Sequence, residues 1–423
     1  MKHNKLIFIT IALTLLAGLV YINFAGPERK VESEIEHKYA VSDPQFLRSM
    51  GLLLGPSILE GNKATELLNG DAIFRSMLQA IRSARQTVLF ETYIYWSGDI
   101  GNEFADALSE RARAGVKVHV LLDWVGSAKI DHGVLDKMKT AGVEVEQYHP
   151  LRWYNLGRLN NRTHRKLLIV DGAVGFTGGV GIAPLWTGNG QDPDHWRDSH
   201  FRVEGPVVAQ MQSVMLDNWA KTTGKVLHGV QYFPPLKPAG GESAQMFASS
   251  PNGGSESMLM MYLLAITAAT RSIDLSSAYF VPDDLMRKAL VAAVKRGVKL
   301  RIITPGEHMD AETVRRASRG LWGELLEAGA EMYEYQPTMY HCKVMIVDGL
   351  MTSVGSTNFD VRSFRLNDEA NLNIYDAAFA ARQTKVFVDD LKHARRITAE
   401  AWKARPWRDK LHEHTLALFG GLL

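Results

Sequence analysis

The chain contains one cysteine, Cys342, among 423 residues. A single thiol excludes a disulfide within the chain and a zinc site built from several cysteines. An excess of either charge is also missing, because 48 Lys and Arg residues stand against 46 Asp and Glu residues, for a formal net charge of +2. Dedicated nucleic-acid-binding proteins usually carry a strongly basic excess or stripe. We therefore expect no nucleic-acid partner.

The composition is otherwise that of a folded protein. Hydrophobic residues make up 46% of the chain and charged residues 22%, which excludes wholesale disorder. Domains commonly contain about 100–200 residues, so the length predicts two core domains with additional segments.

Charged side chains are absent from Leu6 to Gly26. As a helix, such a run matches a hydrocarbon core of about 30 Å. A cleaved signal peptide is the alternative, but its apolar region usually has only about 7–15 residues. The sequence therefore favours an uncleaved membrane anchor over residues 6–26, followed by a linker over residues 27–60. Lys and Arg flank both ends of the run, so charge leaves its orientation open.

Four segments of the first half recur in the second half in the same order. The offset is 185 residues between Ile81 and Ile266, and 177 residues between His164 and His341. Such self-similarity is the signature of a duplicated structural unit. The matched pairs are IRSARQTVLFETYIY and ITAATRSIDLSSAYF, RARAGVKVHVLLD and AVKRGVKLRIITP, AGVEVEQYHP and AGAEMYEYQP, and HRKLLIVDGAVGFTGG and HCKVMIVDGLMTSVGS.

Each copy alternates helical and strand patterns. Apolar residues recur at helical spacing over residues 101–114, and residues 116–122 form an apolar run of strand length. This alternation predicts α/β layers with a covered sheet. We expect two similar α/β sandwich domains related by a pseudo-two-fold axis, over residues 61–231 and 259–423. Residues 232–258 are rich in Pro, Gly and Ser and are predicted to connect them.

Each copy also carries the pattern H-x-K-x4-D, which one chain contains by chance only about 0.03 times. Side chains at positions i and i+2 of a strand share a face, so His and Lys should point the same way. A turn of small residues follows each motif: Gly178–Gly181 in the first copy and Gly355–Asn358 in the second. The motif residues are His164, Lys166 and Asp171, and His341, Lys343 and Asp348.

Two imidazoles and two ammonium groups around one cleft would repel each other unless an anion lay between them. A phosphate ester matches His, Lys, Asn and backbone N–H donors best. A neutral imidazole is suited to attack its phosphorus, and a second histidine can protonate the leaving alkoxide and then activate the acceptor. The lysines with Ser356 and Asn358 would hold the phosphate oxygens, so that the reaction requires no metal or other cofactor. A lone histidine in a core strand would instead be read as a structural residue.

The strings HRKLLIVD, HCKVMIVD and GSTNFDVRSFRLNDE resemble the HKD phospholipase D superfamily. The last of them, with HWRDSHFRVEGPVV and the tail from Ala401, is similar to bacterial cardiolipin synthases. The resemblance covers roughly residues 70–423 and implies two phospholipase D-like domains that transfer a phosphatidyl group to an alcohol such as phosphatidylglycerol. It also implies a phosphohistidine on His164, with His341 as acid and base.

The resemblance assigns further residues. The motif aspartates are mainly structural in the family, and a later carboxylate orients each motif histidine. The matching carboxylates are Asp198 and Glu369. The chain departs from the family pattern at Gly181, where the first copy should have Asn, so that Asn358 is the surer phosphate donor.

The resemblance also implies a place and partners. We expect a phospholipid substrate and an enzyme on the bacterial cytoplasmic membrane; a positive N-terminal stub held inside would place the catalytic domains on the extracytoplasmic side. Three alternatives remain: hydrolysis as a phospholipase D, a phosphodiesterase acting on nucleic acid, and a non-catalytic membrane protein that binds lipid or phosphate. The C-terminal stretch from His393 to His414 is predicted to be a packed helix, with an amphipathic lid as the alternative. The oligomeric state stays open.

Overall fold

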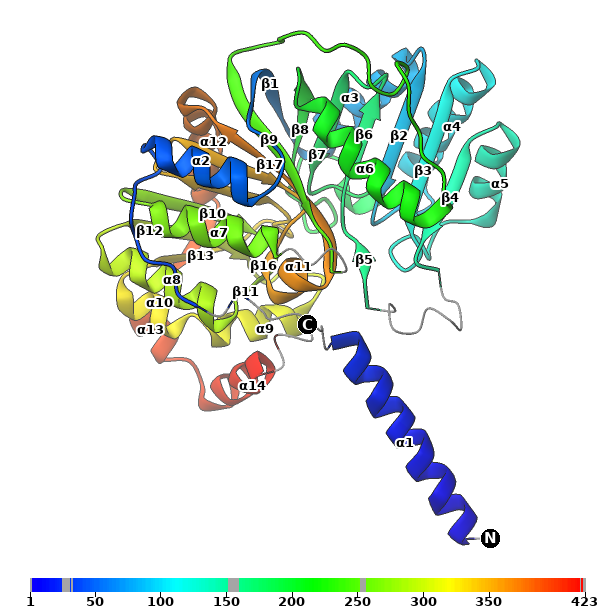
Figure 1. The fold of residues 1–423 in the computed structure, drawn as a ribbon. Helices are drawn as coiled ribbons and strands as arrows, with labels where there is room; N and C mark the ends of the chain where they lie inside the picture. The colour runs from blue at the N-terminus through cyan, green and yellow to red at the C-terminus, as the bar shows by residue number, and fades with distance from the viewer. Residues whose placement is uncertain are drawn as a thin grey trace.

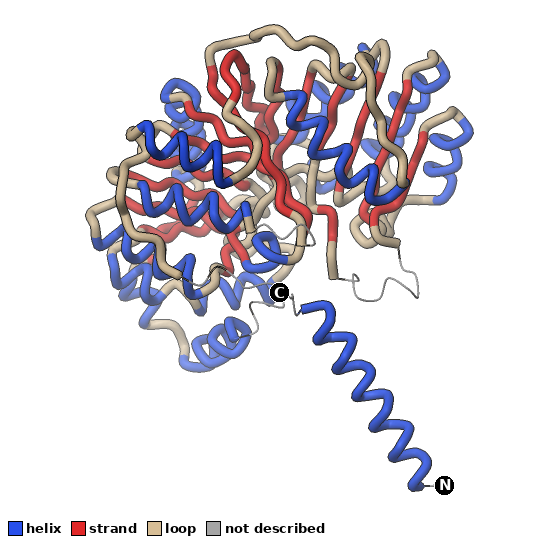
Figure 2. The backbone as a smooth tube through the Cα atoms, viewed as in Figure 1, coloured by secondary structure: helices blue, strands red, loops and turns tan. Residues whose placement is uncertain are grey.

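Sixteen strands of the described residues form one mixed sheet that runs through both halves of the chain (Figures 1 and 2). The structure is a computed structural model that describes residues 2–24, 31, 33–150, 160–251, 256–418 and 420. Helices flank the sheet, as Figure 2 shows. The architecture is the α/β class that the alternating pattern predicted.

The strand order reads the same from both ends toward the centre, apart from one extra edge strand in the second half. From the centre outward the first half contains β1 (Leu59–Leu68), β8 (Ser199–Glu204), β7 (Val174–Gly178), β6 (Leu167–Val170), β2 (Thr87–Thr92), β3 (Lys117–Asp123) and β4 (Glu144–Tyr148). The second half contains β9 (Glu242–Ser249), β17 (Asn367–Tyr375), β15 (Met351–Gly355), β14 (Lys343–Val347), β10 (Ser272–Ser277), β12 (Lys299–Pro305), β13 (Glu331–Tyr335) and the extra strand β18 (Ala394–Ile397).

The halves meet where β1 pairs antiparallel with β9, with Leu59 opposite Ala244. This central pair relates the halves by the expected pseudo-two-fold axis. The expectation that residues 232–258 form a connector is wrong in part, because β9 lies inside that range. The Pro- and Gly-rich residues flank β9, so the second repeat begins at Glu242.

Short strands lie outside the main path of the sheet. β5 (Arg162–Thr163) pairs parallel with β17, and β11 (Phe280–Val281) pairs parallel with β16 (Phe359–Asp360). The β5–β17 pairing joins the first half to the second next to the first HxK motif. An isolated bridge between Arg197 and Tyr340 repeats it with the halves exchanged.

The helices begin and end at residues suited to those positions. The Asp376 side chain accepts from the Phe379 N–H at the start of α12, and Gly224 ends α6 in the left-handed conformation at φ 70°. α2 (Pro44–Leu53) precedes the first half in the chain but packs on the second half. The helices of the first half are α3 (Asn69–Ser83), α4 (Asp99–Arg113), α5 (His132–Thr140), the 3₁₀ turn η2 (Pro184–Trp186) and α6 (Val208–Thr223). Those of the second half are α7 (Ser257–Ala268), α8 (Asp284–Lys295), α9 (Glu312–Gly320), α10 (Gly323–Ala328), α11 (Val361–Arg365), α12 (Ala377–Leu391), α13 (Ala399–Lys403) and α14 (Trp407–Leu418).

Three clusters of buried apolar side chains hold these layers together. One packs α3 and α4 on the first half, and one packs α7 and α8 on the second. The third lies under α6 and α12 and contains residues of both halves, which ties the halves together. Cys342 belongs to this third cluster and is only 1% exposed. Burial of each large apolar side chain stabilises the fold by about 1.5–3 kcal/mol.

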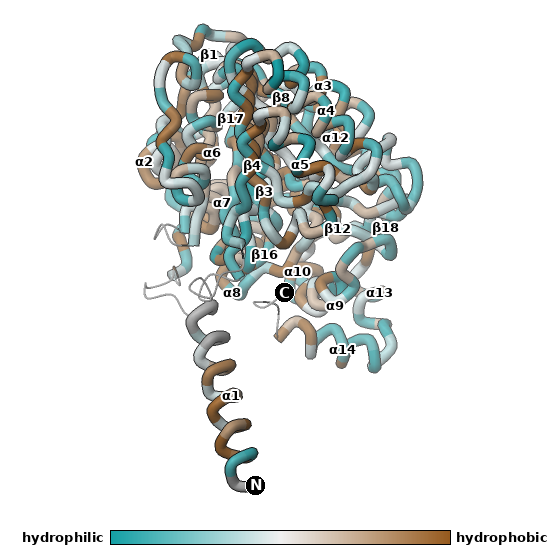
Figure 3. The backbone as a smooth tube through the Cα atoms, turned by 90° about the vertical axis from the view of Figure 1, so that its right-hand side faces the viewer, coloured by the Kyte–Doolittle hydropathy of each residue, from teal (hydrophilic) through white to brown (hydrophobic). Residues whose placement is uncertain are grey.

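The N-terminal helix α1 (Lys2–Phe24) extends away from the sheet (Figures 1 and 3). Large apolar side chains such as Leu6, Phe8 and Leu15 are exposed along it. In the part of the chain that the structure describes, no helix meets the length and apolarity required to span a bilayer. The anchor expected over residues 6–26 is therefore not confirmed, and its last two residues lie outside the described ranges.

Candidate active site

The two HxK motifs lead into equivalent strands, β6 and β14, and each starts against the other half of the chain. The His164 N–H donates to the Asp368 carbonyl at 2.9 Å, and the His341 N–H donates to the Arg197 carbonyl at 2.8 Å. Because these backbone bonds cross between the halves, each motif histidine is fixed at their junction.

Each histidine is also bound by a carboxylate from the other half. Nδ1 of His164 lies 2.9 and 3.0 Å from the two carboxylate oxygens of Glu369, and Nδ1 of His341 lies 2.7 Å from an oxygen of Asp198. Both carboxylates are fully buried. The expectation that these carboxylates lie on the motif histidines agrees with this geometry, which adds that the pairs are exchanged between the copies.

The contact with a carboxylate determines which ring nitrogen of each histidine is available for chemistry. An ionised carboxylate can only accept, so Nδ1 of each ring must donate to it. In a neutral ring Nε2 then carries a lone pair. The carboxylate contact therefore leaves Nε2 of each histidine able to attack an electrophile or to exchange a proton.

Burial keeps both histidines neutral. It lowers the pKa of His164 to about 4, against the opposing charge of Glu369, and it lowers the pKa of His341 as well. The carboxylates behave in the opposite way. Burial alone would raise their pKa, but His164 beside Glu369 and His341 beside Asp198 bring both pKa values below the usual range. Each pair is thus a neutral imidazole on an ionised carboxylate at pH 7.

The two motif lysines are buried with the histidines. Nζ of Lys166 donates to the His164 carbonyl at 2.8 Å, and Nζ of Lys343 donates to the His341 carbonyl at 2.7 Å. Burial lowers the pKa of Lys166 to about 7 and also lowers the pKa of Lys343. The Lys343 charge lowers the pKa of both His164 and Lys166, so that the cations of the two halves share one electrostatic environment. An anion bound among them would relieve this repulsion.

The carboxylates are held differently in the two halves. In the second half the Ser356 hydroxyl donates to Glu369 at 2.5 Å. In the first half Gly179 occupies the equivalent position, and a Cβ there would lie 2.1 Å from an oxygen of Asp198. The Trp186 indole N–H donates to Asp198 at 2.9 Å instead. Ser356, expected at the phosphate, therefore supports the carboxylate.

The departure at Gly181 has a steric explanation. A Cβ at Gly181 would lie 2.8 Å from Cβ of Ile94 and 3.2 Å from the Trp186 ring, so an Asn side chain has no room. In the second half Asn358 fills the equivalent position; it is 3% exposed, and its Oδ1 has no hydrogen-bond partner among the described residues.

The motif aspartates lie at the opposite ends of β6 and β14 from the histidines. Asp171 accepts from the backbone N–H groups of residues 85–87, and Asp348 accepts from those of residues 270–272. These bonds fix the turns that lead into β2 and β10, the strands that pair with β6 and β14. The geometry gives Asp171 and Asp348 a structural part, as the resemblance implies.

Aromatic side chains enclose the histidines, and the motif patterns did not single them out. Tyr93 lies edge-on to His164 at 5.3 Å between ring centres, and Trp186 and Trp196 lie 5.2 and 5.4 Å from His341. Trp196 belongs to a string that resembles the family, whereas Trp186 and Tyr93 carry no comparable signal. His200 was also missed; it is 1% exposed and burial lowers its pKa to about 3.

Most of the stretch from residue 151 to residue 162, which has no counterpart in the second copy, lies outside the described residues. Arg162 is described and is buried, with its guanidinium 3.8 Å from Asp123. Among the described residues no group of three or more His, Cys, Asp or Glu side chains is arranged to hold a metal ion.

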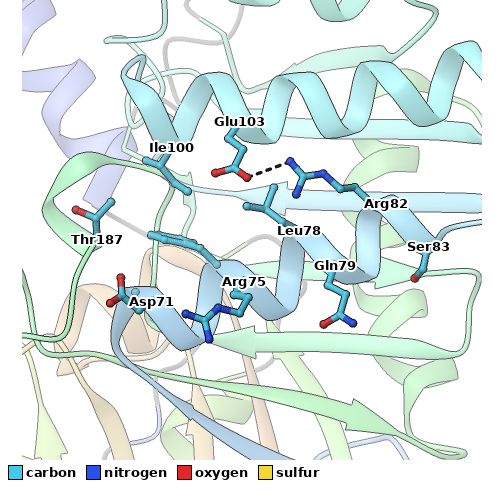
Figure 4. A pocket seen from close by; sticks show the side chains of 11 residues that line it. Asp71, Arg75, Leu78, Gln79, Arg82, Ser83, Ile100, Glu103 and Thr187 are labelled. Atoms are coloured by element: carbon cyan, nitrogen blue, oxygen red, sulfur yellow. Dashed lines mark hydrogen bonds and ion pairs between the residues drawn. The ribbon is translucent and has the colours of Figure 1, made fainter.

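A cavity of about 760 Å³ lies between α3 and α4 (Figure 4). Phe74, Leu78 and Ile100 form its apolar wall, and Arg82 and Glu103 form an ion pair across its rim. Its lining includes none of the motif residues, so the chemistry does not depend on it.

Comparisons with known proteins agree with this geometry. A family model described as "Cardiolipin synthase, PLD-like domain" matches residues 77–189 and 262–391. A cardiolipin synthase of Geobacillus kaustophilus is 36% identical over 84% of the chain and 72% of that protein, and one of Alkalihalophilus pseudofirmus is 35% identical over 90% and 76%. The crystal structure of a phosphatidylserine synthase of Haemophilus influenzae has a TM-score of 0.67 over 90% of the chain and 100% of that structure, at 13% identity, which is a likeness of fold.

Proposed function

Because the chain belongs to the cardiolipin synthase family of phospholipase D-like enzymes, we propose that it transfers a phosphatidyl group from one phosphatidylglycerol molecule to a second, forming cardiolipin and glycerol. The observation that carries this proposal is the reciprocal pairing of His164 with Glu369 and of His341 with Asp198. This pairing supplies two imidazoles of opposite role at one place, as a double displacement at phosphorus requires.

In the first displacement Nε2 of His164 attacks the phosphorus of the donor. The P–N bond forms as the P–O bond to the headgroup glycerol breaks, and the leaving oxygen takes a proton from His341. His341 must be an imidazolium at this moment. The bound phosphodiester anion raises its pKa, and Asp198 stabilises the charged ring, so substrate binding supplies the acid form.

In the second displacement the acceptor hydroxyl loses its proton to His341, and its oxygen attacks the phosphohistidine. The P–N bond breaks, and His164 returns to its neutral form. Lys166, Lys343 and Asn358 stabilise the non-bridging oxygens as their charge changes in both steps. The amide Nδ2 of the buried Asn358 would be its donor to these oxygens.

The proposal includes a place at the bacterial cytoplasmic membrane. The exposed apolar side chains of α1 support insertion of that helix into the bilayer, which would hold the domains at the surface where phosphatidylglycerol lies. A positive N-terminal stub on the cytoplasmic side would place the domains outside the cytoplasm.

The direct test is product analysis. Purified full-length protein incubated with phosphatidylglycerol vesicles should form cardiolipin and glycerol in equal amounts, and His164→Ala and His341→Ala should form neither. Phosphatidic acid as the main product would identify a hydrolase instead. If folded wild-type protein leaves the lipid unchanged, the proposed transfer is wrong.

A further inference from the structure

Helix α14 presents a row of large apolar side chains to solvent. Trp407 is 69% exposed, Leu411 61% and Leu418 85%. Spacings of four and seven residues place these three side chains on one face of the helix. Contiguous exposed apolar patches that are rimmed by polar residues mark protein or membrane interaction sites. We call this row the α14 ridge.

The opposite face of α14 is fixed to the protein. Glu413 is buried and accepts from the guanidinium of Arg319 at 3.1 Å and from that of Arg405 at 2.8 Å. At Gly320 a Cβ would lie 2.8 Å from the Glu413 carbonyl, so α14 packs closely on the end of α9. A helix held by a buried ion-pair network cannot turn its ridge inward without breaking that network.

α14 is linked to the candidate active site through α9 and the strand β11. α9, on which α14 packs, begins two residues after Asp310, and Asp310 accepts from the Tyr279 hydroxyl at 2.7 Å. The Asp310 charge raises the pKa of His341, which places it near that ring. Just beyond α14, a Cβ at Gly420 would lie 2.8 Å from Val281, in the strand that follows Tyr279. The C-terminal end of α14 therefore lies next to β11, and its middle packs on the end of α9.

The chemistry of the ridge favours a lipid surface as its partner. The Arg408 guanidinium lies 5.7 Å from the centre of the Trp407 ring, and Lys410 is half-buried on the same helix. Tryptophan and leucine beside arginine and lysine suit the boundary between acyl chains and anionic headgroups. α14 and the apolar helix α1 also lie on the same lower side of the molecule in two perpendicular views (Figures 1 and 3).

We propose that α14 is an interfacial helix that inserts its ridge into an anionic phospholipid bilayer and so holds the active-site rim against the membrane. The proposal builds on the proposed function only in naming a lipid as the substrate; binding of the ridge to lipid does not depend on the transfer chemistry. Insertion would shorten the path of the scissile phosphate from the bilayer to His164 and His341.

The first test measures depth. Cys342 is buried and burial raises the pKa of its thiol to about 12, so a fluorophore attaches selectively at Leu411→Cys in the full chain. In phosphatidylglycerol-containing vesicles the probe should show blue-shifted emission and quenching by shallow lipid-attached quenchers. The control Lys237→Cys, at an exposed position between α6 and β9, should show neither. Equal, water-like emission at both positions would overturn the proposal, as would a Leu411→Cys probe buried equally without lipid by a second copy of the chain.

The second test uses activity with a matched control. The triple variant Trp407→Ser, Leu411→Ser, Leu418→Ser should lower the ratio of turnover on vesicles to turnover on a monomeric short-chain phosphatidylglycerol about tenfold. The control triple Leu47→Ser, Leu52→Ser, Leu53→Ser removes comparably exposed leucines of α2, at 40%, 81% and 56%, and should leave that ratio unchanged. If the α14 triple variant and the α2 triple variant have the same ratio of turnover on vesicles to turnover on the short-chain lipid, the proposal is wrong. Wild-type protein inactive on both substrates would refute the proposed function, while the depth test would still decide the role of α14.

Discussion

The two halves of the site reach the same arrangement by different means. In the second half Glu369 is held by the Ser356 hydroxyl, and in the first half the shorter Asp198 is held by the Trp186 indole, with Gly179 leaving room for it. Both carboxylates nevertheless contact Nδ1 of a histidine from the other half, at 2.7 to 3.0 Å. The duplicated unit thus keeps what the chemistry needs and varies what supports it.

The surroundings of the two rings differ as well. His341 packs against a pair of contacting indoles, Trp186 and Trp196, whereas His164 faces the single ring of Tyr93. Identical groups in unlike surroundings can take unlike roles. The comparison therefore supports a division of labour between two histidines that the motif alone cannot distinguish.

The largest difference should appear when each histidine is removed. On phosphatidylglycerol, His164→Ala and His341→Ala should each lower kcat by at least about 10³-fold, since both displacements need both rings. On a donor with a p-nitrophenol leaving group, His341→Ala should still release a burst of about one p-nitrophenol per enzyme, because that group needs no acid. His164→Ala should give no burst. Equal bursts from both variants, measured by stopped-flow absorbance, would remove the proposed division of roles.

The exchanged carboxylates should matter equally. Glu369→Gln and Asp198→Asn keep the shape but replace an ionised partner of Nδ1, and hydrogen bonds to charged groups contribute about 1.5–3 kcal/mol. Each variant should therefore lower kcat about 10- to 100-fold, with little change in Tm. Steady-state kinetics and thermal unfolding check this. A loss confined to one half would show that only one pair serves the reaction.

Substitutions at Gly179 and Ser356 should show how much each half depends on the residue that accommodates or holds its carboxylate. Gly179→Ser places a Cβ 2.1 Å from Asp198 and must displace that carboxylate, so kcat should fall about 100-fold. Ser356→Gly removes one hydrogen bond to Glu369 and should cost about tenfold. The ratio of the two losses is the measurement. A milder effect of Gly179→Ser than of Ser356→Gly would mean that Asp198 has room to move.

The pH profile follows from the buried groups. His164 is neutral above its pKa of about 4, so the acid limb of kcat/KM should lie well below the ordinary imidazole value of about 6.5. The proposed acid, His341, must carry its proton, and burial lowers its pKa as well. Lys166 loses its charge above its pKa of about 7, so kcat/KM should already fall by that pH. The Glu369 charge raises the pKa of His164 and the pKa of Lys166, and Glu369→Gln should therefore move both limbs to lower pH. If Glu369→Gln leaves both limbs of the pH profile at the same pH, Glu369 does not control the pKa of the titrating groups.

The smallest effect on turnover should come from the motif aspartates. Asp171→Asn and Asp348→Asn weaken bonds to backbone amides at the far ends of β6 and β14, so each should lower the free energy of unfolding by about 1–3 kcal/mol. Turnover at a temperature where the variants stay folded should change about twofold or less, because neither carboxylate contacts a motif histidine. Denaturant unfolding and kinetics on the same samples decide the point. Losses as large as those of the histidine variants would place these carboxylates in the reaction.

Local pattern was enough to predict the duplicated α/β unit, the pseudo-two-fold axis and the two motifs. The repeat offset identified His164 and His341 as equivalent, and the resemblance pointed to Asp198 and Glu369. Local pattern could not show that each carboxylate crosses to the other half, because that pairing depends on where β17 and β5 meet in space.

Other features that could not be predicted from the sequence also have physical reasons. β9 was hidden by the Pro and Gly residues around it, since composition averages over a strand as short as eight residues. Trp186 has no counterpart in the second copy, so comparison of the repeats could not find it. The empty space that Gly179 and Gly181 provide is visible only against Asp198, Ile94 and the Trp186 ring.

The central claim is that the two halves build one site in which His164 carries the phosphatidyl group and His341 moves the proton. Phosphatidylglycerol labelled with ³²P, mixed with the enzyme and quenched within one turnover, tests it directly. The account predicts acid-labile, base-stable label on the protein that maps to His164, and no label in His164→Ala. A His341 variant supplied with a ³²P-labelled p-nitrophenol donor should accumulate a larger amount. Label on His341, or unlabelled protein during rapid cardiolipin formation, would contradict it.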